Sequence, residues 1–200
     1  MRVVHYHVVS SSIRSLEARY LGPLGLRLVA RYGRIGDERC AYESGIPWET
    51  LDAIGFRARE TELEGGGVNV VVQSGQWHHP RVDHVGLVAD EETLAQIVRR
   101  AGRRGLAVQS LAGGRRTSIA TGAGLRFEIG LEDGDRPELE PALSELQLRT
   151  DAPAARAKAI ATLVGERPDG ATVEIGGTLV RFVEGGPRGR PELWAERFAA

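Results

Sequence analysis

The feature that most limits the possible folds of this chain is an internal repeat. Three times along the sequence, an alternating strand-like segment is followed by a stretch with helical spacing and then by a glycine. Repeats of this kind indicate copies of one supersecondary unit that pack against each other. A polar residue of the first strand and the closing glycine are 20, 21 and 20 residues apart in the three copies: His5–Gly25, His84–Gly105 and Glu145–Gly165.

Short strands separated by glycine-rich turns follow each helical segment. Residues 47–60 resemble a loop or a short helix inserted into the first copy, and residues 190–198 resemble a short amphipathic helix. Asp90 and Asp151 are expected to cap the second and third helices. Period-two alternation predicts the strands 2–9, 39–43, 68–74, 81–88, 106–111, 115–121, 124–131, 144–149, 171–175 and 178–183.

These units predict an α+β fold built from βαβββ modules. Two modules side by side would form a half-open cup of mixed β-sheet with the helices outside, and a shortened βαββ module would follow them. The expected boundaries are 1–80 for the first module, 81–132 for the second, and 133–200 for the third module with its tail. We expect the three to form one compact domain.

Strand parity indicates which side chains of the first strand would face the cup, because neighbouring residues point to opposite faces of a sheet. Val4, Tyr6 and Val8 are expected to pack beneath the helix. That arrangement leaves His5 and His7 in the cup.

The same parity applies to the closing strand of each module. In 125–131, Arg126 and Glu128 are expected to face the cup. In 68–74, the polar residues Asn69 and Gln73 are expected to face it, with Val71 between them.

His5, His84 and Glu128 are the candidate metal ligands, because two imidazoles and a carboxylate converging on one point suit a divalent ion. Either histidine alone is more typical of a half-buried strand residue with a satisfied hydrogen bond. Their equivalent positions in two repeats favour the metal interpretation. His7 either replaces His5 as a ligand or acts as a base beside the metal.

Candidate substrate-binding residues follow from the same cup. Arg126 either binds an anionic group of a substrate or pairs with an acid. Trp48 and Trp77 either form aromatic walls for a substrate or pack in the core. Asn69 would add a polar contact.

Composition excludes several classes of protein. The net charge of −1 argues against general nucleic-acid binding. No apolar run approaches the roughly 18 residues of a membrane-spanning helix. Cys40 is the single cysteine, so no disulfide can form within the chain, and with no basic leader at the start a cytoplasmic location is expected. An odd number of modules favours a homodimer.

The segments MRVVHYHVVS to LGPLGLRL, VDHVGLVADEETLAQIVRRAGRRGLAV and GAGLRFEIG resemble the glyoxalase/bleomycin-resistance/dioxygenase family, the vicinal oxygen chelate superfamily. The longer glyoxalase-like bacterial proteins of that superfamily are the most similar. The resemblance covers about half of the chain. It implies modules of one strand, one helix and three strands, with a metal ligand on the first and last strand of each. His5, His84 and Glu128 match three of the four ligand positions.

The chain departs from the family pattern at the fourth ligand. The family usually has Glu, Gln or His on the strand that corresponds to 68–74, which contains no acid. Gln73 or Asn69 is one candidate, and Val71 would leave the position empty. An empty position would give a triad of two histidines and one carboxylate, as in non-haem iron oxygenases.

Two functions remain open on this evidence. The first is a metalloenzyme that chelates a small oxygenated substrate to iron, zinc, nickel, manganese or cobalt, with isomerase, lyase or dioxygenase chemistry unresolved. The second is a metal-free protein that sequesters a small molecule or an antibiotic. A structural or regulatory module has less support.

Overall fold

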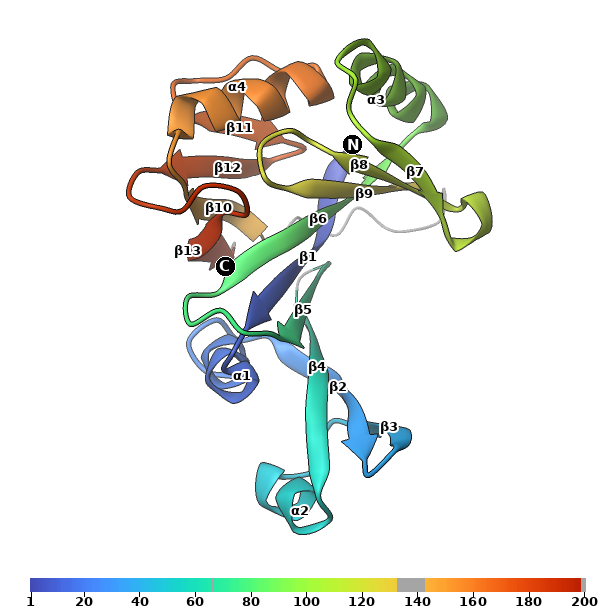
Figure 1. Cartoon of the computed structure of the whole chain (residues 1–200), viewed down its shortest axis with the longest axis vertical. Helices are drawn as coiled ribbons and strands as arrows, with labels where there is room; N and C mark the ends of the chain where they lie inside the picture. The colour runs from blue at the N-terminus through green and yellow to red at the C-terminus, as the bar shows by residue number, and fades with distance from the viewer. Residues whose placement is uncertain (66, 133–142, 199–200) are drawn as a thin grey trace.

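A single curved sheet of 13 strands runs through the molecule, and the helices cover one side of it (Figure 1). The computed structural model describes residues 1–65, 67–132 and 143–198. Residues 133–142 and 199–200, which were expected in the third module, lie outside the described residues. The strand order along the main path is β11-β12-β10-β13-β6-β1-β5-β4-β2-β3, with β7, β8 and β9 continuing from β6.

The first module contains an additional strand and helix. Its closing strand β5 lies parallel to β1, and β4, β2 and β3 follow in antiparallel order. Its elements are β1 (Arg2–Ser10), α1 (Ile13–Leu21), β2 (Arg27–Ile35), β3 (Glu38–Glu43), α2 (Trp48–Ala53), β4 (Phe56–Gly65) and β5 (Val68–Ser74).

The second module repeats this order without the additional elements. Its closing strand β9 is parallel to β6, as β5 is to β1. The side chain of Asp90 caps α3 by accepting a hydrogen bond from the backbone N–H of Thr93, as predicted. The elements are β6 (Arg81–Ala89), α3 (Glu91–Arg103), β7 (Val108–Leu111), a 3-10 turn at Ala112–Gly114, β8 (Arg116–Ala120) and β9 (Arg126–Leu131).

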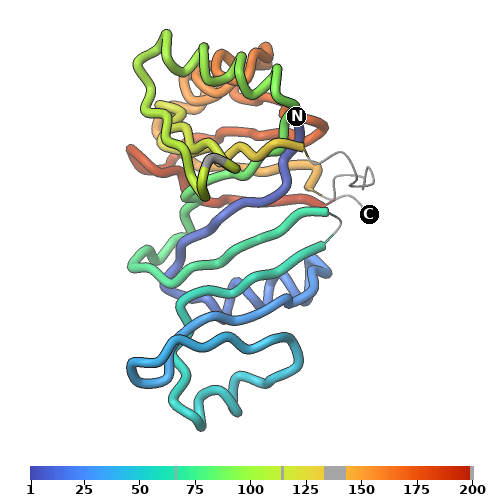
Figure 2. The backbone as a smooth tube through the Cα atoms, turned by 90° about the vertical axis from the view of Figure 1, so that its right-hand side faces the viewer, coloured from blue at the N-terminus to red at the C-terminus, as the bar shows by residue number. Residues whose placement is uncertain are grey.

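The third module is shorter, and its helix α4 lies beside α3 at one end of the molecule (Figures 1 and 2). Asp151 was predicted to cap α4, and this is wrong: Ala152 occupies the cap position, and the Asp151 carboxylate instead accepts from Arg156 and Thr150. The elements are β10 (Leu143–Arg149), α4 (Pro153–Val164), β11 (Thr172–Ile175), β12 (Thr178–Val183) and β13 (Glu192–Phe198).

The predicted α+β class with a curved sheet of repeated modules is confirmed. The prediction of a helix at 190–198 is wrong, because these residues form β13. Its backbone hydrogen-bonds along β10, and Leu193 is buried while Trp194 is 55% exposed. The interpretation of 47–60 omitted a strand: α2 ends at Ala53 and β4 begins at Phe56.

The two halves of the cup meet where β1 and β6 pair antiparallel. The pairing shifts by one residue between Val3 and His5, which makes a β-bulge at Val4. Val3 is therefore the buried residue of this strand end, and Val4 is only half-buried. The prediction that Val4 packs beneath the helix is wrong for this reason, whereas Tyr6 and Val8 are fully buried.

β10 and β13 reproduce the β1–β6 pairing in the third module. They are antiparallel, and their register shifts at the two corresponding points. Glu145 consequently lies where His5 lies in β1. Its buried carboxylate is 2.9 Å from the Nε of Arg181 and 3.3 Å from the Nε of Arg197. An ion-pair cluster therefore occupies the position that corresponds to the first candidate ligand.

The helix side of the sheet forms one continuous hydrophobic core across the three modules. Tyr6, Tyr20, Phe127 and Phe182 are among its largest fully buried side chains. Among the described residues, no helix is both long enough and apolar enough to cross a membrane.

A buried ion pair fixes α1 to the sheet of the first module. The Nε and Nη2 of Arg31 donate to the two carboxylate oxygens of Glu17 at 2.9 and 2.6 Å. Thr61 and the indole N–H of Trp48 also donate to this carboxylate. The Nη1 of Arg31 donates to the carbonyl of Ile46. These five hydrogen bonds compensate for the burial of two charges that water does not reach.

Arg31→Met is expected to lower the free energy of unfolding by about 3–5 kcal/mol, because it leaves the Glu17 carboxylate buried without its cation. Arg27→Met on the same strand is the matched control. Arg27 pairs with Glu64 at the surface, where such pairs contribute about 0–1 kcal/mol. Urea denaturation of both variants measures the difference. Equal losses would contradict this account.

Candidate metal centre

His5, His84 and Glu128 converge on one face of the sheet. One ligand atom of each residue lies within 4.8 Å of those of the other two, and the three form the single group of this kind among the described residues. The Nε2 of His84 is 3.7 Å from a carboxylate oxygen of Glu128. His84 is buried, and the other two are half-buried. The strands therefore bring together the three residues that the sequence predicted.

The register of β1, β6 and β9 explains why the three side chains converge. His5 on β1 lies opposite Gly86 on β6, and Gly86 lies opposite Glu128 on β9. The imidazole of His5 lies directly over Gly86, in the space that a Cβ would occupy. Because Gly86 has no side chain, the His5 ring can lean toward Glu128 and His84.

His5 and His7 are held in their neutral forms. Burial, with the nearby His84, lowers the pKa of His5 from 6.5 to about 3. Burial and His84 also lower the pKa of His7, to about 4. The Nε2 of His7 is buried without a hydrogen-bond partner. Neutral imidazoles have a free lone pair, which a metal ligand or a hydrogen-bond acceptor requires.

Asp83 is a member of the site that the sequence did not identify. β6 has a bulge here, since Val8 pairs with Val82 and His7 pairs with His84. Simple alternation would have sent Asp83 to the helix face, but the bulge turns its carboxylate toward the cup.

The Asp83 carboxylate links three groups of the site. It is 3.1 Å from the Nδ1 of His84 and accepts from Arg126 at 2.6 Å. Arg190 pairs with it at 2.7 Å from the loop before β13. The hydrogen bond to His84, with the two arginines, lowers the pKa of Asp83 to about 2. An ionised Asp83 fixes the His84 ring with Nε2 directed at Glu128, as carboxylates do for metal-binding histidines.

The position on β5 that would supply a fourth ligand is occupied by a valine. In the second module, Glu128 lies two residues beyond the partner of His84. The corresponding position in β5 is Val71, which pairs with His7. Asn69 pairs with His5, but its amide donates to Glu62 at 2.7 Å. Gln73 is four residues further along and exposed, opposite Val9.

The remaining candidate residues lie away from the triad. Trp48 is on the helix side of the first module, where it hydrogen-bonds Glu17 and stacks with Arg14 and Arg31. Trp77 is half-buried in the loop before β6, 5.4 Å from the guanidinium of Arg190. Trp77 thus touches the site through Arg190, whereas Trp48 does not.

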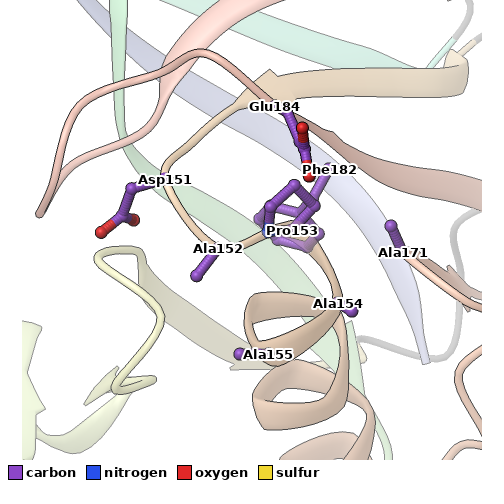
Figure 3. Close-up of a pocket in the computed structure, with 8 residues that line it drawn as sticks. All are labelled: Asp151, Ala152, Pro153, Ala154, Ala155, Ala171, Phe182 and Glu184. Carbon is purple, nitrogen blue, oxygen red and sulfur yellow. The ribbon is translucent and has the colours of Figure 1, made fainter.

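A separate hollow of about 430 Å³ lies at the start of α4 (Figure 3). Its lining includes Asp151 and, grouped together apart from it, Pro153, Phe182 and Glu184. It has no histidine and no cation, so it offers no chemistry comparable with that of the triad.

Solved structures of several enzymes have a fold similar to that of this chain. A catechol 2,3-dioxygenase matches with a TM-score of 0.56 and 13% identity over 95% of this chain and 69% of that chain. A Mn(II)-bound glyoxalase from Novosphingobium aromaticivorans matches with 0.55 and 13%, over 96% and 63%. A variant 4-hydroxymandelate synthase from Streptomyces coelicolor matches with 0.55 and 13%, over 92% and 62%.

The fold is that of the vicinal oxygen chelate proteins. At 13% identity the matches establish the fold alone. The chain spans less than two thirds of the glyoxalase and of the synthase. No family model and no curated protein matches the sequence.

The metal-free protein is expected to lose stability as the pH falls below 6.5. The folded-state pKa values of His5 and His7 lie below 6.5, so the unfolded chain binds more protons between pH 6.5 and 4. Denaturant midpoints measured with a chelator present should therefore fall over this range.

His7→Asn should flatten that decline, because it removes one of the two depressed groups. His79→Asn is the control, since His79 is exposed in the loop before β6. An identical pH profile for the wild type and His7→Asn would contradict the assignment.

Proposed function

We propose that this protein is a metalloenzyme in which His5, His84 and Glu128 hold one divalent ion. The observation that carries the proposal is the convergence of these three side chains within 4.8 Å. Two nitrogens and one carboxylate oxygen suit iron, manganese, cobalt, nickel or zinc. The Nε2 of His7 is buried without a hydrogen-bond partner, and the His7 ring lies 4.8 Å from that of His84. An unpaired polar atom beside the triad supports the fit.

A divalent ion bound there would act as a Lewis acid that stabilises negative charge on two adjacent oxygens of a small substrate. Three protein ligands leave coordination positions open, as in catalytic rather than structural sites. The valine at position 71 supports a three-ligand centre, and Gln73 is the remaining candidate for a fourth. The reaction class is an isomerisation, a lyase reaction or an oxygenation.

The residues around the triad have separate tasks in this proposal. Glu128 would hold the ion and is also a candidate base. His7 is neutral and has an unpaired nitrogen beside the triad, which would accept or return a proton of the substrate. Asp83 positions His84 and keeps its Nδ1 protonated.

Metal analysis tests the proposal directly. Protein produced without a polyhistidine tag is expected to contain about one equivalent of a divalent transition metal. His84→Ala and Glu128→Gln should lose it, while His79→Ala, an exposed histidine, should retain it. Elemental analysis of the four proteins provides the measurement. Wild-type protein that binds no metal on reconstitution would favour the alternative of a metal-free binding protein.

Gly86→Ala is expected to weaken metal binding by roughly 10- to 100-fold without touching a ligand, the range seen when a ligand's support is changed. The added methyl group would occupy the space of the His5 ring and push it away from Glu128. Gly130→Ala on β9 is the matched control, since its methyl group would contact nothing within 4 Å.

Competition with a chromogenic chelator measures both affinities. Equal metal binding by the two glycine variants would show that the His5 ring is not held over Gly86 in the metal-bound protein.

A further inference from the structure

A second cavity adjoins the triad where the second and third modules meet. Its volume is about 490 Å³. One wall comes from β6 and the β8–β9 turn, and the other from α4 and the loop before β13. The charged residues that line it are Asp83, Arg126, Arg156 and Arg190.

The inner end of the cavity is one side chain away from the candidate metal ligands. Asp83 and Arg126 line the cavity, and both contact the Nδ1 of His84. The guanidinium of Arg126 is also 3.7 Å from a carboxylate oxygen of Glu128. A molecule bound to the triad would therefore contact Arg126 through a substituent that is only a few bonds away from its triad-binding atoms.

The cavity has an excess of positive charge. Arg126 and Arg190 share the Asp83 carboxylate, and Arg156 pairs with Asp151 at 2.9 Å. Among the residues that line the cavity, three guanidinium groups face one carboxylate, and Glu128 and Asp151 offset part of this positive charge from outside the lining. Each guanidinium has five N–H donors in a planar fork that suits the two oxygens of a carboxylate.

The opposite side of the cup carries charges of both signs. Glu60 and Glu62 on β4 pair with Gln73 and Val71 of β5, and Glu62 accepts from Asn69. Glu60 and Gln73 line a hollow there together with Arg34, Arg39 and Arg59. The cavity at Asp83 is distinguished from this hollow because two of its lining residues, Asp83 and Arg126, contact the ring of the candidate ligand His84.

The cavity is built before any ligand arrives. Arg190 is held between Asp83 and the ring of Trp77. Gly124 in the β8–β9 turn lies so close to the carbonyl of Gly189 that a side chain there would clash. The two walls are therefore in direct contact, and a preorganised site loses less entropy on binding.

We propose that this cavity binds a carboxylate of the substrate. The substrate would then be a small carboxylic acid with two adjacent oxygens, the oxygens directed to the triad and the carboxylate to Arg126, Arg156 and Arg190. The identity of the whole substrate rests on the proposed function, but anion binding in the cavity does not. The third module thereby supplies two of the three arginines that select the substrate.

Metal-free protein tests the cavity by itself. In ¹⁹F NMR titrations, 4-fluorobenzoate should bind saturably, and neutral 4-fluorobenzyl alcohol should bind at least tenfold more weakly. Arg156→Gln and Arg190→Gln should each weaken 4-fluorobenzoate roughly tenfold or more, the loss of one charged hydrogen-bonding partner. Arg188→Gln is the control, because Arg188 is on the same loop, is 95% exposed and does not line the cavity.

Circular dichroism and urea midpoints establish that each variant is folded. Because two arginines are replaced separately, the test still works if one of the two variants misfolds. Equal affinity of the wild type, Arg156→Gln and Arg190→Gln for 4-fluorobenzoate would overturn the proposal. So would equal affinity of the wild type for the acid and the alcohol.

Mn²⁺-loaded protein then tests the link between cavity and triad. Calorimetry should give tighter binding of 3,4-dihydroxybenzoate than of catechol. Arg156→Gln should abolish that preference, whereas the control Arg188→Gln should keep it, together with the metal content of the wild type. If the protein binds no metal, the proposed function fails, and the fluorobenzoate titration still decides the cavity. A preference that survives Arg156→Gln would overturn the role of the cavity in substrate selection.

Discussion

The antiparallel pairing of β1 with β6 is the constraint on which the rest of the site depends. It joins the two halves of the cup and sets His5 and His84 on the same face of the sheet. Each strand carries one bulge, and each bulge changes which side chain faces the cup. Without the second bulge, Asp83 would point to the helix side, and the ring of His84 would lack the carboxylate that orients it. Local irregularity in two strands thus determines the chemistry of the centre.

Much of this architecture could be predicted from sequence, because the core obeys simple periodicity. Val85, Leu87 and Ala89 are buried at period-two spacing on one face, and the helix after them has a capping aspartate. β4 was missed for a physical reason: its cup face carries charged residues, so its apolar signal is reduced to a few buried side chains such as Leu63. The β13 segment was predicted to be a helix because the spacing of Leu193, Trp194 and Phe198 suits either a helix or a strand. Its pairing with β10 is what makes it a strand.

The triad itself could be predicted, because equivalent positions in two repeats identify His5 and His84 without knowledge of register. The surrounding residues could not. Arg190 reaches Asp83 across more than 100 residues of chain, and nothing near it in sequence indicates that contact. The homodimer stays a prediction. The odd number of modules supports it less strongly, because β13 gives the third module a partner strand within the same chain.

The pair β10–β13 has a wider consequence. It repeats the backbone geometry of β1–β6, yet Glu145 there is neutralised by Arg181 and Arg197 instead of joining a histidine pair. The same backbone arrangement therefore accommodates two kinds of side-chain cluster. One has neutral imidazoles with free lone pairs, and the other has a carboxylate that is paired with two arginines. A duplicated framework of this type separates shape from chemistry: the backbone arrangement that groups two histidines and a carboxylate in one place carries a buried ion-pair cluster at the equivalent positions of the other.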